Sequence, residues 1–85
     1  MRRFEIEFSG RAIIELDDEV IDVVDDEWRS QLYDLNTPEE IAEHVGYNLI
    51  INGISLSSMD GWADMDNKKA VIYASDFGVE SVEEI

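Results

Sequence analysis

A long stretch with a single sign of charge limits what this chain can fold into. Between Ala12 and Asn67 it carries fifteen acidic side chains and one basic side chain, Arg29. Concentrated like charge opposes compaction, so this stretch needs strong apolar packing in order to fold. Its apolar residues are regularly spaced. We therefore expect the charge to lie on the surface of a structured domain.

The composition favours a folded domain over a disordered chain. The 85 residues are 45% hydrophobic, contain one proline and have a net charge of −15. High charge alone would favour disorder, but the apolar content is too high for that. We expect one domain over residues 1–85. Binding to DNA, RNA or anionic membranes is disfavoured, because phosphate contacts need lysine and arginine.

The sequence also limits compartment and cofactors. It contains no cysteine, which excludes disulfides and thiolate metal sites. The start, Met-Arg-Arg-Phe, lacks the apolar run of a signal peptide, and no stretch approaches the ~20 apolar residues of a membrane span. We expect a cytoplasmic protein with no cofactor.

Two alternating runs at the N-terminus predict a β-hairpin. Residues 4–8 and 12–16 each alternate apolar with polar side chains, although Ile13 interrupts the polar face of the second run. Ser9-Gly10 between them is a turn signal.

The next segment predicts a helix over residues 18–33, begun by the capping chemistry of Asp17-Asp18. Its apolar residues come in pairs at helical spacing, with acids opposite them. The β-branched residues favour strand instead, so a strand over residues 19–25 is the alternative.

The strongest local signal is Thr37-Pro38-Glu39-Glu40. Thr37 can cap a helix, Pro38 suits its first position and Glu40 completes a capping box. We expect this helix to run to about Asn52, with Gly53 as its C-terminal stop.

The remainder predicts a loop and a closing strand. Residues 54–67 lack a periodic pattern, and residues 70–75 read as a strand. Residues 76–85 form an acidic tail that either extends this strand or packs loosely. The expected fold is α+β: a small antiparallel sheet of about three strands with two helices on one face, in ββααβ order.

Acids on the first predicted helix recur about every four residues, roughly 6 Å apart along its axis. Carboxylates held in this way can occupy the lysine and arginine contacts of a surface that grips a phosphate backbone. The alternative is a solvated helix face. The candidate partner-binding residues are Asp18, Asp22, Asp25, Asp26, Glu39, Glu40, Glu43, Tyr47 and Trp62, with Tyr33 as a further aromatic anchor.

Size, charge and the mixture of acids with a short apolar pattern resemble the small acidic proteins that bacteriophages make against host defences. These include anti-CRISPR proteins and DNA-mimicking anti-restriction proteins. The resemblance is one of overall character and rests on no motif. It implies an inhibitor that occupies a nucleic-acid or target-recognition surface of a bacterial nuclease complex.

Three other features offer weaker candidate sites. Asp60 to Asn67 holds oxygen ligands for Ca²⁺ or Mg²⁺, but not in the order of an EF-hand, so a solvated turn is favoured. Trp62 either anchors a partner or completes the core, and the core is favoured. Trp28 is expected in the core. His44, the one histidine, has no motif around it that would make it a general base.

The sequence therefore predicts a non-enzymatic inhibitor whose partner is a CRISPR effector or restriction enzyme with a basic surface. A phage assembly protein that acts through apolar contacts is the second hypothesis, and a divalent-cation binder is the third. The sequence leaves the oligomeric state open.

Overall fold

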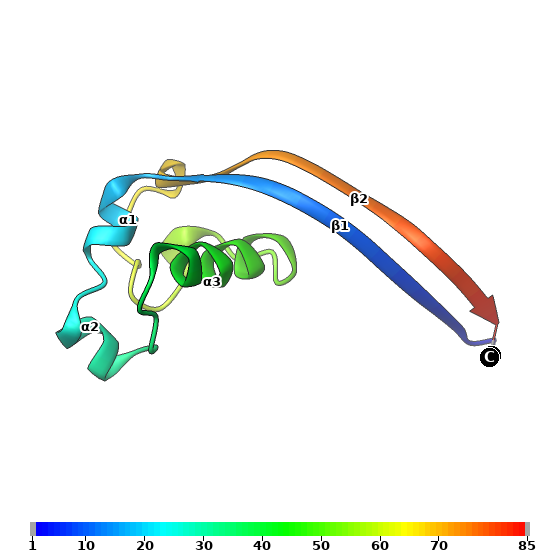
Figure 1. Cartoon of the computed structure of the whole chain (residues 1–85), viewed down its shortest axis with the longest axis horizontal. Coiled ribbons are helices and arrows are strands. Elements are labelled where there is room, and N and C mark those ends of the chain that lie inside the picture. Colours follow the sequence, from blue (N-terminus) through cyan, green and yellow to red (C-terminus); the bar gives the residue numbers. More distant parts are fainter. Residues whose placement is uncertain (1, 85) are drawn as a thin grey trace.

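The computed structural model shows an α+β protein in which a long β-ribbon projects from a cluster of short helices (Figure 1). It describes residues 2–84, and for residues 7, 8 and 74 the backbone alone. The elements are β1 (Phe4–Leu16), α1 (Asp18–Asp22), α2 (Asp26–Gln31), α3 (Pro38–Ile50), the 3₁₀ helices η1 (Leu56–Ser58) and η2 (Asn67–Lys69), and β2 (Ala70–Glu84).

The predicted N-terminal hairpin is wrong. β1 runs through Ser9-Gly10 without turning and pairs antiparallel with β2 from Phe4↔Glu84 to Leu16↔Ala70. The ring of Phe77 on β2 lies over Gly10, where an added Cβ would be 2.0 Å from Phe77 Cδ1. Gly10 therefore makes room for an aromatic side chain across the ribbon instead of forming a turn.

The ribbon has two strands rather than about three, and residues 76–84 extend β2. Of the two alternatives for the acidic tail, the extended strand is the one confirmed. The order along the chain is one strand, three α-helices and one strand, so ββααβ is also wrong in detail.

Two β-bulges keep Ile72, Phe77, Val79 and Val82 of β2 on one face. The register shifts opposite Glu7/Phe8 and Ile13/Ile14, which leaves Glu80 and Tyr73 as the extra residues of β2. Residues directly opposite one another in an antiparallel pair share a face. The apolar ribbon face therefore carries Phe4, Ile6, Ala12, Ile14 and Leu16 from β1 and Ala70, Ile72, Phe77, Val79 and Val82 from β2.

The single helix predicted over residues 18–33 is divided in two, and the alternative strand over residues 19–25 is wrong as well. α1 ends at Asp22, and the Asp25 side chain accepts a hydrogen bond from Trp28 N at 2.8 Å, which starts α2. An Asp that caps a new helix competes with continuation of the old one. The β-branched pair Val23-Val24 lies in the break, where helix propensity is low.

The helix predicted at Thr37-Pro38 is confirmed. Thr37 Oγ1 accepts from Glu40 N at 3.1 Å, and Pro38 opens α3. The reciprocal half of the capping box is displaced by one residue, since Glu40 accepts weakly from Asn36 N at 3.4 Å. α3 ends at Ile50, two residues before the predicted end, and Gly53 follows with a φ of +62°.

The core lies between the three α-helices and the segment from Gly53 to Lys69. This segment is irregular, as predicted, yet it supplies Leu56, Met59 and Trp62, which are at most 5% exposed. They pack with Val20, Val24, Trp28, Ile41, Val45 and Ala70. The helices lie on one side of the ribbon (Figure 1), and Ile14 Cδ1 reaches the backbone of α3 at Gly46.

The molecule is elongated because the ribbon extends past the helices. The radius of gyration is 15.8 Å and the longest dimension is 48 Å. A compact chain of this length has a radius of gyration of roughly 12 Å. None of the described helices has the length and apolar character needed to cross a membrane.

Gly61 offers a test of how the core closes. It has a φ of +99°, and an added Cβ would lie 2.5 Å from Trp28 Cζ2. Gly61→Ala is expected to lower the free energy of unfolding by about 2–4 kcal/mol, because backbone strain and overpacking both act there. Urea denaturation measures the change.

Gly78→Ala is the matched control, since an added Cβ at Gly78 meets nothing within 4 Å. It should change the free energy of unfolding by less than about 0.5 kcal/mol. Equal effects of the two substitutions would contradict this placement of Gly61 against Trp28.

Candidate acidic protein-binding surface

Most of the negative charge lies on the helical part of the molecule, residues 17–69, which we call the acidic head. It carries fourteen acidic and three basic side chains. Thirteen of the fourteen acidic residues are exposed, and Glu40 is half-buried. The expectation that a folded surface displays the charge is confirmed for this region.

Three acids of the head build its local structure. Asp17, Asp25 and Asp66 begin α1, α2 and η2, and each accepts a backbone N–H two or three residues further on at 2.8–3.0 Å. An N-cap carboxylate satisfies an otherwise unpaired helix donor and interacts favourably with the helix dipole. Asp25 was a candidate for partner binding, and the structure gives its side chain this capping contact.

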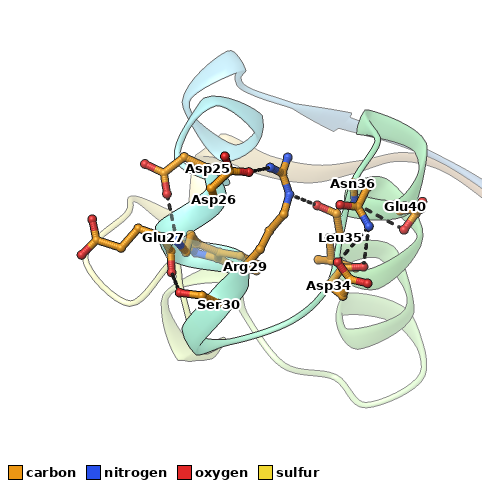
Figure 2. Close-up of polar contacts among 10 residues, drawn as sticks. Asp25, Asp26, Glu27, Arg29, Ser30, Asp34, Leu35, Asn36 and Glu40 are labelled. Atoms are coloured by element: carbon orange, nitrogen blue, oxygen red, sulfur yellow. Dashed lines mark hydrogen bonds and ion pairs between the residues drawn. The ribbon is translucent and has the colours of Figure 1, made fainter.

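Two bases of the head are neutralised nearby. Arg29 forms an ion pair with Asp26 at 3.1 Å, and its Nε donates to Leu35 O at 2.6 Å, which connects α2 to the next segment (Figure 2). Lys69 Nζ lies 3.0 Å from Glu19 Oε2, and this hydrogen bond raises the pKa of Lys69. Both bases therefore hold the head together.

The regular row of acids predicted on one helix does not form, because that helix is divided. Asp18 and Asp22 lie exposed on α1, whereas Asp26 begins α2. The Asp26 side chain is fully exposed to solvent. The three carboxylates remain at the same end of the molecule, where α1 and α2 lie (Figure 1). Asp18 and Asp22 keep the spacing of about 6 Å on α1, but the repeat does not continue to Asp26 on α2.

α3 brings together a second group of candidates. Glu40, Glu43 and Tyr47 line one hollow of about 340 Å³, and Glu39, Glu43 and Tyr47 line part of another of about 510 Å³ between α3 and the ribbon. Tyr47 is 57% exposed. Acids beside an exposed aromatic ring form a surface that can combine charge attraction with apolar contact.

Trp62 cannot serve as a partner anchor. It is 1% exposed, and its Nε1 donates to Val20 O at 3.0 Å, so the core interpretation is confirmed. Trp28 is also in the core, with its ring centroid 5.1 Å from that of Trp62. Tyr33 remains 40% exposed, with its ring against Trp28 and His44.

His44 packs between aromatic rings. Its ring centroid lies 4.5 Å from that of Tyr33 and 5.8 Å from that of Trp62. Burial lowers the pKa of His44. It therefore contributes to packing in its neutral form.

The acidic turn at residues 60–67 uses two of its oxygen ligands internally. Asp66 accepts from Lys68 N, and Asn67 Oδ1 accepts from Ser57 N at 2.8 Å. Across residues 2–84, in the part whose side chains are described, no group of three potential ligands is close enough to hold a metal ion.

The sequence interpretation missed the exposed part of the apolar ribbon face. Phe4, Ile6, Phe77, Val79 and Val82 are 46–61% exposed there. The alternation in residues 4–8 was a sufficient signal for β1. In β2 the bulges at Tyr73 and Glu80 hide the same signal, because they disturb the period of two.

Comparison of the chain with protein-family models, curated proteins and solved structures gave no match.

The lowered pKa of His44 predicts a pH dependence. The unfolded chain takes up a proton near pH 6.5, whereas the folded chain takes it up at a lower pH. The stability from neutral His44 is complete above pH 6.5 and is lost as the pH falls through the folded pKa. In urea unfolding at pH 7.5 and 5.5, His44→Gln should therefore lose less stability than the wild type.

The substitution leaves every other titratable group in place, so the difference between the two pH dependences isolates His44. Identical pH dependences would show that the ring gains protons equally in the folded and unfolded chains.

Proposed function

We propose that this chain is a non-catalytic, phage-type inhibitor that binds a nucleic-acid-handling host defence complex in the bacterial cytoplasm. A CRISPR effector or a restriction enzyme is the class of target. The observation that carries the proposal is the excess of fourteen acids over three bases on the acidic head. A protein surface that binds nucleic acid is rich in lysine and arginine, and it is the natural complement of such a head.

The arrangement of the head supports this function in two ways. The core fixes the positions of the carboxylates, since Trp62 joins the loop after α3 to α1 through Val20 O. Fixed charges lose less entropy on binding than charges on a disordered tail. Exposed charges of one sign also attract an oppositely charged partner over a distance and accelerate association at low salt.

Two groups of acids carry the proposed contact. Asp18, Asp22 and Asp26 belong to α1 and α2, and Glu39 and Glu43 to α3. Tyr47 supplies an aromatic contact beside Glu43. Asp25 and Trp62 contribute indirectly: Asp25 caps α2, and Trp62 packs in the core that holds the helices of the head in place.

A second candidate function is a phage assembly protein that acts through apolar contacts. The exposed residues of the apolar ribbon face favour it. The two functions differ in salt dependence, because ionic strength screens charge contacts between exposed groups and leaves apolar contacts largely unchanged.

The proposal is tested by capture of partners from bacterial lysate on the tagged protein, with parallel washes at low and high salt. A nuclease or CRISPR complex that is retained at low salt and released at high salt would support the inhibitor. A partner retained equally at both salt concentrations would favour the assembly protein.

Neutralising the two acid groups gives a sharper prediction. The variant Asp18→Asn, Asp22→Asn, Asp26→Asn, Glu39→Gln and Glu43→Gln should bind the captured complex at least about fivefold more weakly at low salt, since each exposed contact contributes roughly 0.2–1 kcal/mol. Surface plasmon resonance measures the affinity. Protection of phage plating on a host with the active defence system should fall in parallel.

The matched control neutralises acids of the ribbon instead: Glu5→Gln, Glu15→Gln, Asp76→Asn, Glu80→Gln and Glu83→Gln. It removes the same number of charges and should keep most of the affinity. Equal losses in the two variants would mean that net charge, and not the acidic head, governs binding.

A further inference from the structure

The ribbon is about twice as long as the helix that covers it. β1 has 13 residues and spans about 43 Å at ~3.3 Å per residue. α3 also has 13 residues but spans only about 20 Å at ~1.5 Å per residue. α3 therefore covers the part of the apolar ribbon face nearest the head, and the rest extends beyond it (Figure 1).

The exposed fractions follow this division. At the head end, Ala70 is 4% exposed, and Ile14 and Leu16 are half-buried. At the far end, which we call the distal ribbon face, Phe4, Ile6, Val79 and Val82 are 46–61% exposed. A two-stranded ribbon is marginally stable without a packed face. Ile72 at the head end is 45% exposed, so the helices cover this end of the face only in part and leave the far end open.

α3 in turn has an apolar surface that its own ribbon leaves open. The hollow of about 510 Å³ between α3 and the ribbon is lined by Gly46, Tyr47, Ile50 and Ile51 on one side and by Phe77 on the other. The charged residues Arg11, Glu39 and Glu43 line it as well. Tyr47 and Ile51 are 57% and 62% exposed. We call this hollow the α3 groove.

We propose that a second copy of this chain covers the distal ribbon face, with the distal ribbon face of each copy packed into the α3 groove of the other. The α3 helix of the second copy would then cover the part of the ribbon face that the chain's own α3 does not reach. The contact is reciprocal, as in a two-fold symmetric dimer. The α3 groove includes Glu39, Glu43 and Tyr47 of the proposed function, so a second copy and a host target would compete for it. The experiments below use this chain alone, so failure of the dimer is distinct from failure of the proposed function.

Charge and area are consistent with this occupant. Arg2 stacks on Phe4 and forms an ion pair with Glu84, so the tip carries a neutralised pair. The acidic heads lie at opposite ends of the dimer, which limits their repulsion. The half-exposed aromatic rings of Phe4, Tyr47 and Phe77 would bury roughly 300 Å² together. The exposed side chains of Ile6, Ile51, Val79 and Val82 add to this area, toward the ~800 Å² per partner of a standard interface.

Sedimentation velocity over a range of concentrations tests the dimer. The wild type should reach twice the monomer mass of 9.7 kDa. Val79→Lys, on the distal ribbon face, should weaken dimerisation at least about tenfold, because an unpaired ammonium group would be buried. Ser81→Lys is the matched control with the same charge change on the opposite face of β2, and it should leave the dimer intact.

Near-ultraviolet circular dichroism of Trp28 and Trp62 shows whether the head of each variant is folded. A wild type that stays monomeric at every concentration would overturn the proposal. Equal weakening by Val79→Lys and Ser81→Lys in folded heads would overturn it as well.

The absence of cysteine permits a direct test of the arrangement. In the double variant Val82→Cys and Tyr47→Cys, oxidation should give a covalent dimer on a non-reducing gel. Ser81→Cys with Tyr47→Cys should not, since residue 81 lies on the other face. Equal cross-linking of the two double variants would contradict the packing of the distal ribbon face into the α3 groove.

Discussion

The burial of Trp62 is the constraint on which the acidic head depends. Its side chain is 1% exposed, it donates a hydrogen bond to Val20 O, and its ring packs against Trp28 and His44. These contacts join the irregular segment after α3 to all three α-helices. Short helices such as α1 and α2 are not stable alone, so tertiary packing must hold them. Without this core, fourteen acids in one region would favour an expanded chain.

The parts of the fold that could be predicted are those with a strong local signal. Thr37-Pro38 begins α3 because capping and a fixed φ act within one turn. Ser9-Gly10 misled the prediction, because Gly10 provides space for Phe77, which is 67 residues away in the sequence. The break after α1 depends on competition between Asp25 as a new cap and the continuing helix, and its outcome is set by packing. The pairing of β1 with β2 joins the two ends of the chain, and no local sequence pattern predicts such a long-range contact.

Sequence reasoning identified the acids of the candidate surface but not the task of each one. An Asp before a helix and an Asp on a helix face look alike in sequence, so Asp25 counted as a surface charge although it caps α2. Trp62 had two interpretations, and its burial decided between them. The distal ribbon face was missed because one bulge at Glu80 moves Val82 onto the face of Val79. Hydrophobic periodicity cannot show such a shift until the partner strand is known.

The molecule has two parts: the acidic head is stabilised by its own core, and the distal ribbon face stays exposed until a second copy packs on it. Amide hydrogen exchange at low and high protein concentration tests both parts in one measurement. Amides of α3 and of Trp62 should exchange slowly at both concentrations, whereas paired amides near Ile6 and Val82 should become protected only at high concentration. Equal protection of head and ribbon, unchanged by concentration, would contradict the account.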